Sequence, residues 1–541
     1  MTKTPISVAS VTLALLFAAA PAHATEDKLA AELRFGKAQG DIEVIVQYRT
    51  APSEAHHQRI ARLGGTLVSR MDYIHAGHYT MPGSALSRLS EDPEVTYITP
   101  NRTVRPMMDI PALTVNAAAA AAAGYDGKNI GVAVIDSGIG LATNFNHLVY
   151  QASFVAGSAV DQWGHGTHVA GLIASNGGGT VYTGIVPNAN IVNLRALDQY
   201  GNGTDATVIS AINAAISLKS TYNIRVINLS LGRAVYEAAA LDPLCQAVEA
   251  AWKAGIVVVV AAGNNGRDNS AGTNGYGTIT APGNDPYVIT VGAMKDMHTS
   301  SRADDLIASY SSKGPTMIDH IVKPDLVAPG NLIVSTMGPS FGLPAMYPQN
   351  KVASTEYILS GTSMAAPIVS GAAIAMIQKT PSLTPDQVKA RLMKTASKTF
   401  PRSSVAVDPV TKVAYTSYYD IFTIGAGYLD IAAALANTDV ASGRALSPTA
   451  VYDSRTGQAT VQSTVIAAVS TVWGSSTVWG SSTVWGSSVW ASGTSTVWGS
   501  STVWGSSTVW GSSTVWGSST VWGSSTTDAS EAIGVAINGE N

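Results

Sequence analysis

Short runs of apolar, β-branched residues recur along the middle of the chain, each followed by polar residues or glycine. The segments between several of these runs have helical patterns. Strands that are apolar on both faces and alternate with helices are typical of a parallel sheet that helices cover on both sides. The sequence therefore predicts an α/β fold with a doubly wound parallel sheet. The expected strands are 130–135, 190–194, 226–229, 256–261 and 288–291.

In open parallel sheets, functional residues gather beyond the carboxyl ends of the strands. Asp136 ends the first expected strand, within Val-Ile-Asp-Ser-Gly at 134–138. Asn264 follows the fourth, within Ala-Ala-Gly-Asn-Asn-Gly at 261–266. We therefore expect both side chains at one edge of the sheet.

Two further glycine-rich segments carry His165, in Gly-His-Gly-Thr-His-Val-Ala-Gly at 164–171, and Ser363, in Gly-Thr-Ser-Met-Ala-Ala-Pro at 361–367. A serine hydroxyl is a weak nucleophile near neutral pH. It needs a histidine to accept its proton and a carboxylate to orient that histidine. We expect Asp136, His165 and Ser363 to be the catalytic acid, base and nucleophile. We expect His165 and Ser363 each to lie at the start of a helix. The free backbone amides at the start of the second helix favour negative charge beside the serine.

These four segments, in the order Asp, His, Asn, Ser, resemble those of the subtilisin-like serine proteases (subtilase family, peptidase S8). The resemblance extends over about 107–437. It implies a serine endopeptidase that cleaves proteins or peptides through an acyl-enzyme, with broad specificity and no cofactor in the chemistry. It also implies an oxyanion hole made by the Asn264 side chain and the Ser363 backbone N–H.

Ser230, Leu231 and Gly232 match the segment that pairs with an extended substrate backbone in this family. Such main-chain pairing tolerates many substrate sequences. No acidic cluster is evident beside these three residues, which favours apolar or aromatic P1 residues. Calcium is common in the family, but the loop at 175–184 contains no carboxylate. A calcium site therefore stays unassigned, and the metal ligands are unknown.

Three residues that could be mistaken for catalytic groups have simpler interpretations. Asp161 fits the family pattern Asp-x-x-Gly-His-Gly and is expected to order its loop. His168 is expected to be a structural residue of the helix that His165 opens. Cys245 is the only cysteine of the 541 residues, so it cannot form an intramolecular disulfide. Its helical pattern predicts a buried, unreactive thiol.

The chain begins with a secretory signal pattern at 1–24, which has an apolar run and an Ala-His-Ala cleavage site. Residues 25–106 read as β-α-β-β-α-β, a ferredoxin-like α+β order. They resemble the inhibitory propeptide of subtilases, which implies self-cleavage between about Arg105 and Asp109. Four of the ten histidines lie here, namely His56, His57, His75 and His78. We expect them to be solvated, with acid-sensitive propeptide release as the alternative.

The low-complexity tail repeats Thr-Val-Trp-Gly-Ser-Ser from Thr471 to Ser525. The even period would align in-register tryptophans on one face of an extended chain. We expect a catalytic domain at 107–437, then a linker and repeat tail at 438–541 that catalysis does not need. Binding to a cell surface, binding to itself and a removable spacer all remain open for the tail.

Export and extracellular action are expected from the signal pattern, with cell-surface association through the tail as a further option. The net charge of −4 and the 13% of charged residues exclude a basic nucleic-acid surface. The apolar runs are too short to span a membrane. A surface or adhesion protein, in which the protease only processes the tail, is the second hypothesis.

Overall fold

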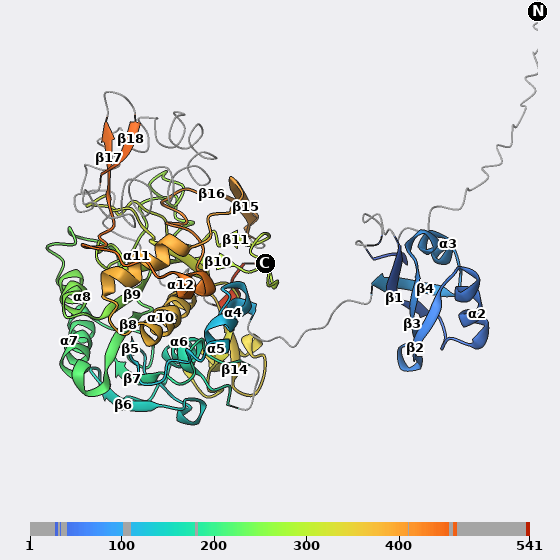
Figure 1. The fold of residues 1–541 in the computed structure, drawn as a ribbon, viewed down its shortest axis with the longest axis horizontal. Helices are drawn as coiled ribbons and strands as arrows, with labels where there is room; N and C mark the ends of the chain where they lie inside the picture. The colour runs from blue at the N-terminus through green and yellow to red at the C-terminus, as the bar shows by residue number, and fades with distance from the viewer. Residues whose placement is uncertain are drawn as a thin grey trace, which may run out of the picture. The chain divides into compact units, whose positions relative to one another are not determined.

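The structure is a computed structural model that describes residues 28–30, 33, 40–100, 110–178, 182–408, 411–453, 458–462 and 537–540. The predicted signal peptide, the expected cleavage segment 105–109 and the repeats at 471–525 lie outside these residues. The chain divides into two compact units, Met1–Pro106 and Met107–Asn541. Figure 1 colours the first unit blue and the second from cyan to red.

The first unit is a four-stranded antiparallel sheet in the order β2-β3-β1-β4, with two main helices. Its elements follow the order β-α-β-β-α-β that the sequence predicts. Val44 and Val46 of β1 are fully buried, whereas the residue between them is partly exposed, as a half-buried strand requires. The elements are β1 (Asp41–Tyr48), α2 (Glu54–Arg62), β2 (Thr66–Met71), β3 (Ala76–Pro82), α3 (Leu86–Ser90) and β4 (Val95–Pro100).

The expectation that the histidines of this unit are solvated is wrong for three of the four. His56, His57 and His78 are each at most 9% exposed. His56 contacts Glu94, His78 contacts Glu43, and His57 contacts the hydroxyl of Tyr79. Polar residue type favours exposure, but polar partners on neighbouring elements allow these rings to be buried.

The second unit is built on an eight-stranded sheet in the order β11-β10-β9-β8-β5-β7-β6, with β12 beside β10. All its ladders are parallel except that of β11 with β10. Strands β5 and β9 are buried at every position, which explains their unbroken apolar sequence. The sheet strands are β5 (Gly131–Asp136), β6 (Leu148–Ser153), β7 (Asn190–Arg195), β8 (Ile224–Leu229), β9 (Val257–Ala261), β10 (Ile289–Lys295), β11 (Leu306–Ile307) and β12 (Leu326–Pro329).

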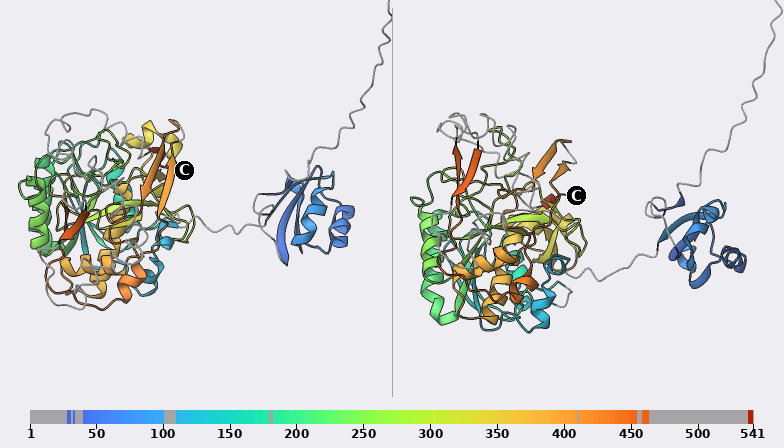
Figure 2. Two further views of the ribbon diagram at one scale, coloured as in Figure 1. Left: turned by 90° about the horizontal axis from the view of Figure 1, so that it is seen from above. Right: turned by 45° about the horizontal axis from the view of Figure 1, so that its top comes forward.

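Helices cover this sheet in two pairs: α7 packs with α8, and α6 packs with α10. Figures 1 and 2 show α7 and α8 (green) stacked along one side of the strands. Helix α7 contacts β5, β7 and β8, whereas α10 contacts β8, β9, β10 and β12. This confirms the predicted α/β class with a parallel sheet. The helices are α4 (Ile110–Thr114), α5 (Ala118–Ala122), α6 (His165–Ala174), α7 (Asp205–Tyr222), α8 (Pro243–Lys253), α9 (Gly342–Met346), α10 (Thr362–Lys379), α11 (Pro385–Thr395) and α12 (Ile431–Ala436).

Three two-stranded antiparallel sheets complete the second unit. They are β13 (Ile333–Thr336) with β14 (Glu356–Leu359), β15 (Ser403–Val407) with β16 (Ala414–Tyr418), and β17 (Thr449–Asp453) with β18 (Gln458–Gln462). Cys245 lies fully buried in α8, and burial raises the pKa of its thiol. The thiol donates a hydrogen bond to Asn284, so the unreactive interpretation stands. Among the described residues, no helix combines the length and apolar character that crossing a membrane demands.

Candidate active site

The predicted acid and base meet at the carboxyl end of β5. Asp136 is the last residue of this strand, and His165 is the first residue of α6. The Asp136 Oδ1 atom lies 2.8 Å from His165 Nδ1, and the aspartate side chain is fully buried. Burial lowers the pKa of His165, but the charge of Asp136 and the hydrogen bond to it outweigh burial and raise the pKa above its usual 6.5. The ring is therefore held in one orientation and readily accepts a proton.

Asp161 orders the loop before His165. Its carboxylate accepts hydrogen bonds from Ser137, from the backbone of Trp163 and Gly164, and from Thr167. With five bonds to loop and helix groups and 1% exposure, it is a structural acid. This agrees with the role that the sequence predicts for it.

His168 also has a structural setting. It is fully buried in α6, and its Nε2 contacts the carbonyls of Ile333 and Tyr357 at 3.2 and 3.1 Å. Burial lowers the pKa of His168 to about 3, so the ring is neutral and donates to one of these carbonyls. This hydrogen bond links α6 to the strand pair β13–β14.

Ser363 is the second residue of α10. Gly361 precedes the helix with a φ of 141°, and a Cβ there would lie 3.1 Å from the Asn264 side-chain nitrogen. The Ser363 hydroxyl donates to the carbonyl of Ser230 at 3.2 Å, and the Ser230 hydroxyl donates to the Ser363 carbonyl at 2.7 Å. Within the described residues, no hydrogen bond joins Ser363 to His165.

Asn264 follows β9 and turns towards the start of α10. Its Oδ1 accepts the backbone N–H of Thr362 at 2.9 Å and the Thr362 hydroxyl at 3.1 Å. These two donors identify the oxygen and nitrogen of the amide. The amide NH2 therefore lies on the opposite side, beside Gly361.

Two adjoining hollows bring the predicted residues together. One, of 540 Å³, is lined by His165, Ser230, Leu231 and Gly232 among others. The other, of 430 Å³, is lined by Leu231, Gly232, Asn264 and Ser363 among others. Because Leu231 and Gly232 line both hollows, the two form one groove, with Asp136 buried behind His165.

The sequence analysis did not identify three other residues that line this groove, namely Trp163, Asp205 and Arg233. The Arg233 guanidinium pairs with Asp205 at 2.8 Å and with buried Asp242 at 2.8 Å. Carboxylates therefore lie beside the predicted substrate segment, and Arg233 balances only one of these two negative charges. No local pattern signals this pairing, because Asp205 opens α7 whereas Arg233 follows β8.

The described residues offer no cluster of three histidine, cysteine or acidic side chains that fits a metal ion. Calcium also binds backbone carbonyls and side-chain amides, so a calcium site stays unassigned.

Comparisons with known proteins agree with this geometry. The sequence model of the subtilase family matches residues 127–420, which span β5, α6, β9 and the start of α10. The chain belongs to the subtilase family. Subtilases are serine endopeptidases, so this chain is a hydrolase of peptide bonds.

Curated relatives extend over most of this subtilase. Serine protease AprX of Bacillus subtilis is 37% identical over 340 residues, which are 60% of this chain and 74% of AprX. Subtilisin E of Bacillus subtilis is 32% identical over 373 residues, 67% of this chain and 87% of that protein. A thermostable alkaline protease of Halalkalibacterium halodurans is 30% identical over 391 residues, 71% and 91% of the two chains.

Proposed function

We propose that this subtilase cleaves proteins with Asp136, His165 and Ser363 as its catalytic triad. The observation that supports this most is the 2.8 Å contact between the buried Asp136 and His165, at the rim of the groove that Ser363 lines. Ser363 Oγ attacks the scissile carbonyl carbon while His165 takes its proton. Asp136 stabilises the imidazolium that forms.

The nucleophile must first leave its resting contact. The Ser363 hydroxyl donates to the Ser230 carbonyl in this structure, so a rotation about its Cα–Cβ bond has to bring it to His165. Catalytic hydrogen bonds often tighten only when substrate is bound. A substrate strand along Ser230–Gly232 would favour that rotation by filling the groove.

The tetrahedral oxyanion then needs two donors. The Ser363 backbone N–H lies in the first turn of α10, and the Asn264 NH2 lies beside Gly361 at the same end of the helix. Collapse of this intermediate expels the amine, which takes the proton from His165, and leaves an ester on Ser363. Water, deprotonated by His165, hydrolyses that ester and regenerates the hydroxyl.

Recognition is assigned to the backbone of Ser230, Leu231 and Gly232. These residues follow β8 and line the groove, Leu231 and Gly232 on both of its sides. Main-chain pairing supports broad specificity. The expectation that no acidic groups lie beside this segment is wrong, because Asp205 and Asp242 together outnumber the charge of Arg233, so no P1 preference is assigned from it.

We further propose that the enzyme is exported as a self-processing zymogen. The pattern at 1–24 would direct export, and the separate compact unit up to Pro106 would be the inhibitory propeptide. Cleavage between about Arg105 and Asp109 would then release a catalytic unit that acts outside the cell. Surface binding or self-association is assigned to the tryptophan repeats.

The test is to replace Ser363 by alanine in the full chain. We expect the secreted protein to retain residues 25–106 and to be unreactive towards a phosphonylating serine inhibitor. Ser403→Ala, on the exposed strand β15, is the matched control and should mature and react normally. If Ser363→Ala matures normally with no other protease present, the self-processing mechanism is wrong.

A further inference from the structure

Residues 537–540 lie against the catalytic unit although the long repeat region precedes them. Ile537 belongs to the main hydrophobic core at 5% exposure, and its carbonyl accepts a 2.6 Å hydrogen bond from Asn350. The Glu540 side chain is 4% exposed. A charged side chain is rarely buried in this way unless specific partners hold it.

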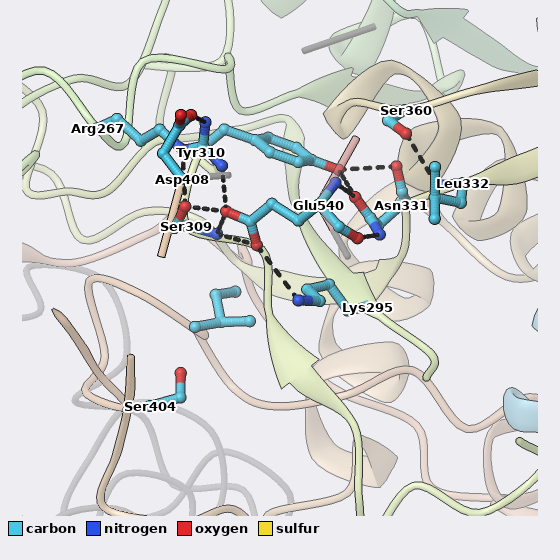
Figure 3. Close-up of polar contacts among 12 residues, drawn as sticks. Arg267, Lys295, Ser309, Tyr310, Asn331, Leu332, Ser360, Ser404, Asp408 and Glu540 are labelled. Atoms are coloured by element: carbon cyan, nitrogen blue, oxygen red, sulfur yellow. Dashed lines mark hydrogen bonds and ion pairs between the residues drawn. The ribbon is translucent and has the colours of Figure 1, made fainter. Parts of the chain in front are cut away.

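The Glu540 carboxylate has such partners (Figure 3). It accepts hydrogen bonds from Arg267 Nη2 at 2.6 Å, from the Ser309 backbone N–H at 3.0 Å, and from the Ser309 hydroxyl. Lys295 Nζ lies 3.8 Å away, and both cationic side chains are themselves nearly buried. Asp408 lies 3.3 Å from the other Arg267 nitrogen, so Glu540 supplies the second of two carboxylates that face these two cations.

The backbone around Glu540 is recognised as well. Asn331 accepts the Glu540 N–H at 2.7 Å and donates to the Glu540 carbonyl at 2.7 Å. Gly539 has a φ of +57°, and a Cβ there would lie 2.5 Å from the Ser360 hydroxyl. Paired bonds from one asparagine and a required glycine fix the register of the segment, so that the carboxylate enters between Arg267 and Ser309.

We propose that Arg267, Lys295, Ser309 and Asn331 form a docking site for an acidic peptide segment, and that its occupant is Ile537–Glu540 of the same chain. The described chain before the repeats is also attached: the Pro448 carbonyl accepts the Val322 N–H, and the Ala450 N–H donates to the His320 carbonyl. Docking therefore fastens the repeat region to the catalytic unit at two points. A cut within the repeats leaves the downstream piece bound through residues 537–540.

This consequence can be measured on the full chain. A recognition sequence for a specific exogenous endopeptidase is inserted between Ser513 and Thr514, in a Ser363→Ala background that prevents self-digestion. After the cut, gel filtration reports whether the fragment from Thr514 onward stays with the catalytic unit. If Ser363 is not the nucleophile, the Ser363→Ala chain still digests itself before the exogenous endopeptidase is added. This result differs from a failure of docking, in which the intact chain is cut and the fragment is then released.

We expect the fragment to stay bound, and Glu540→Gln to speed its release at least tenfold. The matched control is Glu531→Gln, which removes the same charge nine positions earlier and should leave release unchanged. Without any substitution in the docking site, a peptide of residues 536–541 should displace the fragment, whereas the same peptide carrying Glu540→Gln should not. The proposal is overturned if the fragment is released at once with Glu540 intact. It is also overturned if the two glutamine variants release the fragment at the same rate, or if the two peptides displace it equally well.

Discussion

The Oδ1 atom of Asn264 accepts the backbone N–H of Thr362 at 2.9 Å, and this contact fixes which end of the amide is free to donate. Thr362 immediately precedes Ser363, so the start of α10 orients both proposed oxyanion donors at once. The NH2 group costs no reorganisation when the oxyanion forms, because its position is already set.

Replacing Asn264 by alanine should therefore lower kcat with little change in KM, because the lost bond exists chiefly in the transition state. In subtilisin, loss of the oxyanion-hole asparagine costs about 10²–10³ in kcat, and we expect the same range here. Steady-state kinetics on a short peptide measure it, with Asn213→Ala, at an exposed position of α7, as the control. A large rise in KM at constant kcat would instead make Asn264 a substrate-positioning residue.

The pH profile should report the Asp136–His165 pair. Because kcat/KM needs neutral His165, activity should rise with pH through the pKa of this residue, which Asp136 holds above 6.5. Asp136→Asn removes the charge that raises this pKa and leaves the burial that lowers it. The acid limb should then move to lower pH.

The same substitution should also reduce kcat severely, by about 3 × 10⁴-fold if it follows subtilisin. Asp304→Asn, at an exposed site, is the control and should leave both limb and rate unchanged. An acid limb that stays in place in Asp136→Asn would show that another group governs the profile.

The sequence predicted the strands of the sheet well where the chain is continuously apolar. Strand β9 contains only valine and alanine, and β5 contains only valine, alanine and isoleucine between its first glycine and its last aspartate, as burial on both faces of a sheet demands. It missed β12, because Lys323-Pro-Asp325 before that strand is typical of a turn. In the structure, β12 is a fully buried strand that pairs in parallel with β10.

The candidate site was predictable where neighbouring residues form a motif, and unpredictable where distant segments meet. His165 and Ser363 lie in distinctive glycine-rich segments. The pairing of Arg233 with Asp205 depends on how α7 sits against the end of β8, which no local pattern encodes. The burial of Glu540 could not be predicted for the same reason, because its partners Arg267 and Ser309 lie far earlier in the chain.

Asp325 should be among the most destabilising positions to change. Its carboxylate lies 2.8 Å from Lys323 Nζ and 3.2 Å from Lys389 Nζ, and all three side chains are fully buried. Ser447 donates a further hydrogen bond to it at 2.6 Å. Burial lowers the pKa of Lys389 to about 7 even with Asp325 present.

Asp325→Ala leaves two buried lysines without their carboxylate, which costs about 3–5 kcal/mol in comparable buried pairs. Chemical denaturation of the Ser363→Ala protein measures the free energy of unfolding, and Asp304→Ala is the exposed control. A loss below about 1 kcal/mol would mean that the lysines find other partners or lose their protons. The contacts of Ser447 also mean that a truncation that preserves this cluster has to end after it.

Glu540 should influence the active site as well as the attachment of the repeats. Its partners Arg267 and Ser309 belong to two segments, 263–267 and 309–312, that backbone hydrogen bonds join. The Gly266 N–H donates to the Tyr310 carbonyl at 2.8 Å, and the Ser312 N–H donates to the Gly263 carbonyl at 3.0 Å. Asn264 lies within the first segment. The sequence alone predicts a tail that catalysis does not need, whereas these contacts predict that loss of residues 537–540 loosens this asparagine.

Glu540→Gln should thus lower the free energy of unfolding by about 1–3 kcal/mol, since it weakens bonds to buried charged groups. It should also lower kcat in the wild-type background and have less effect in an Asn264→Ala background, with a coupling of about 0.5–3 kcal/mol between the two sites. Peptidase kinetics of the two single variants and the double variant measure this coupling, and Glu531→Gln should show none. A residue that acts by orienting Asn264 loses its effect on kcat once the Asn264 side chain is removed. If the effects of Glu540→Gln and Asn264→Ala on kcat are instead strictly additive, Glu540 contributes only to attachment and stability.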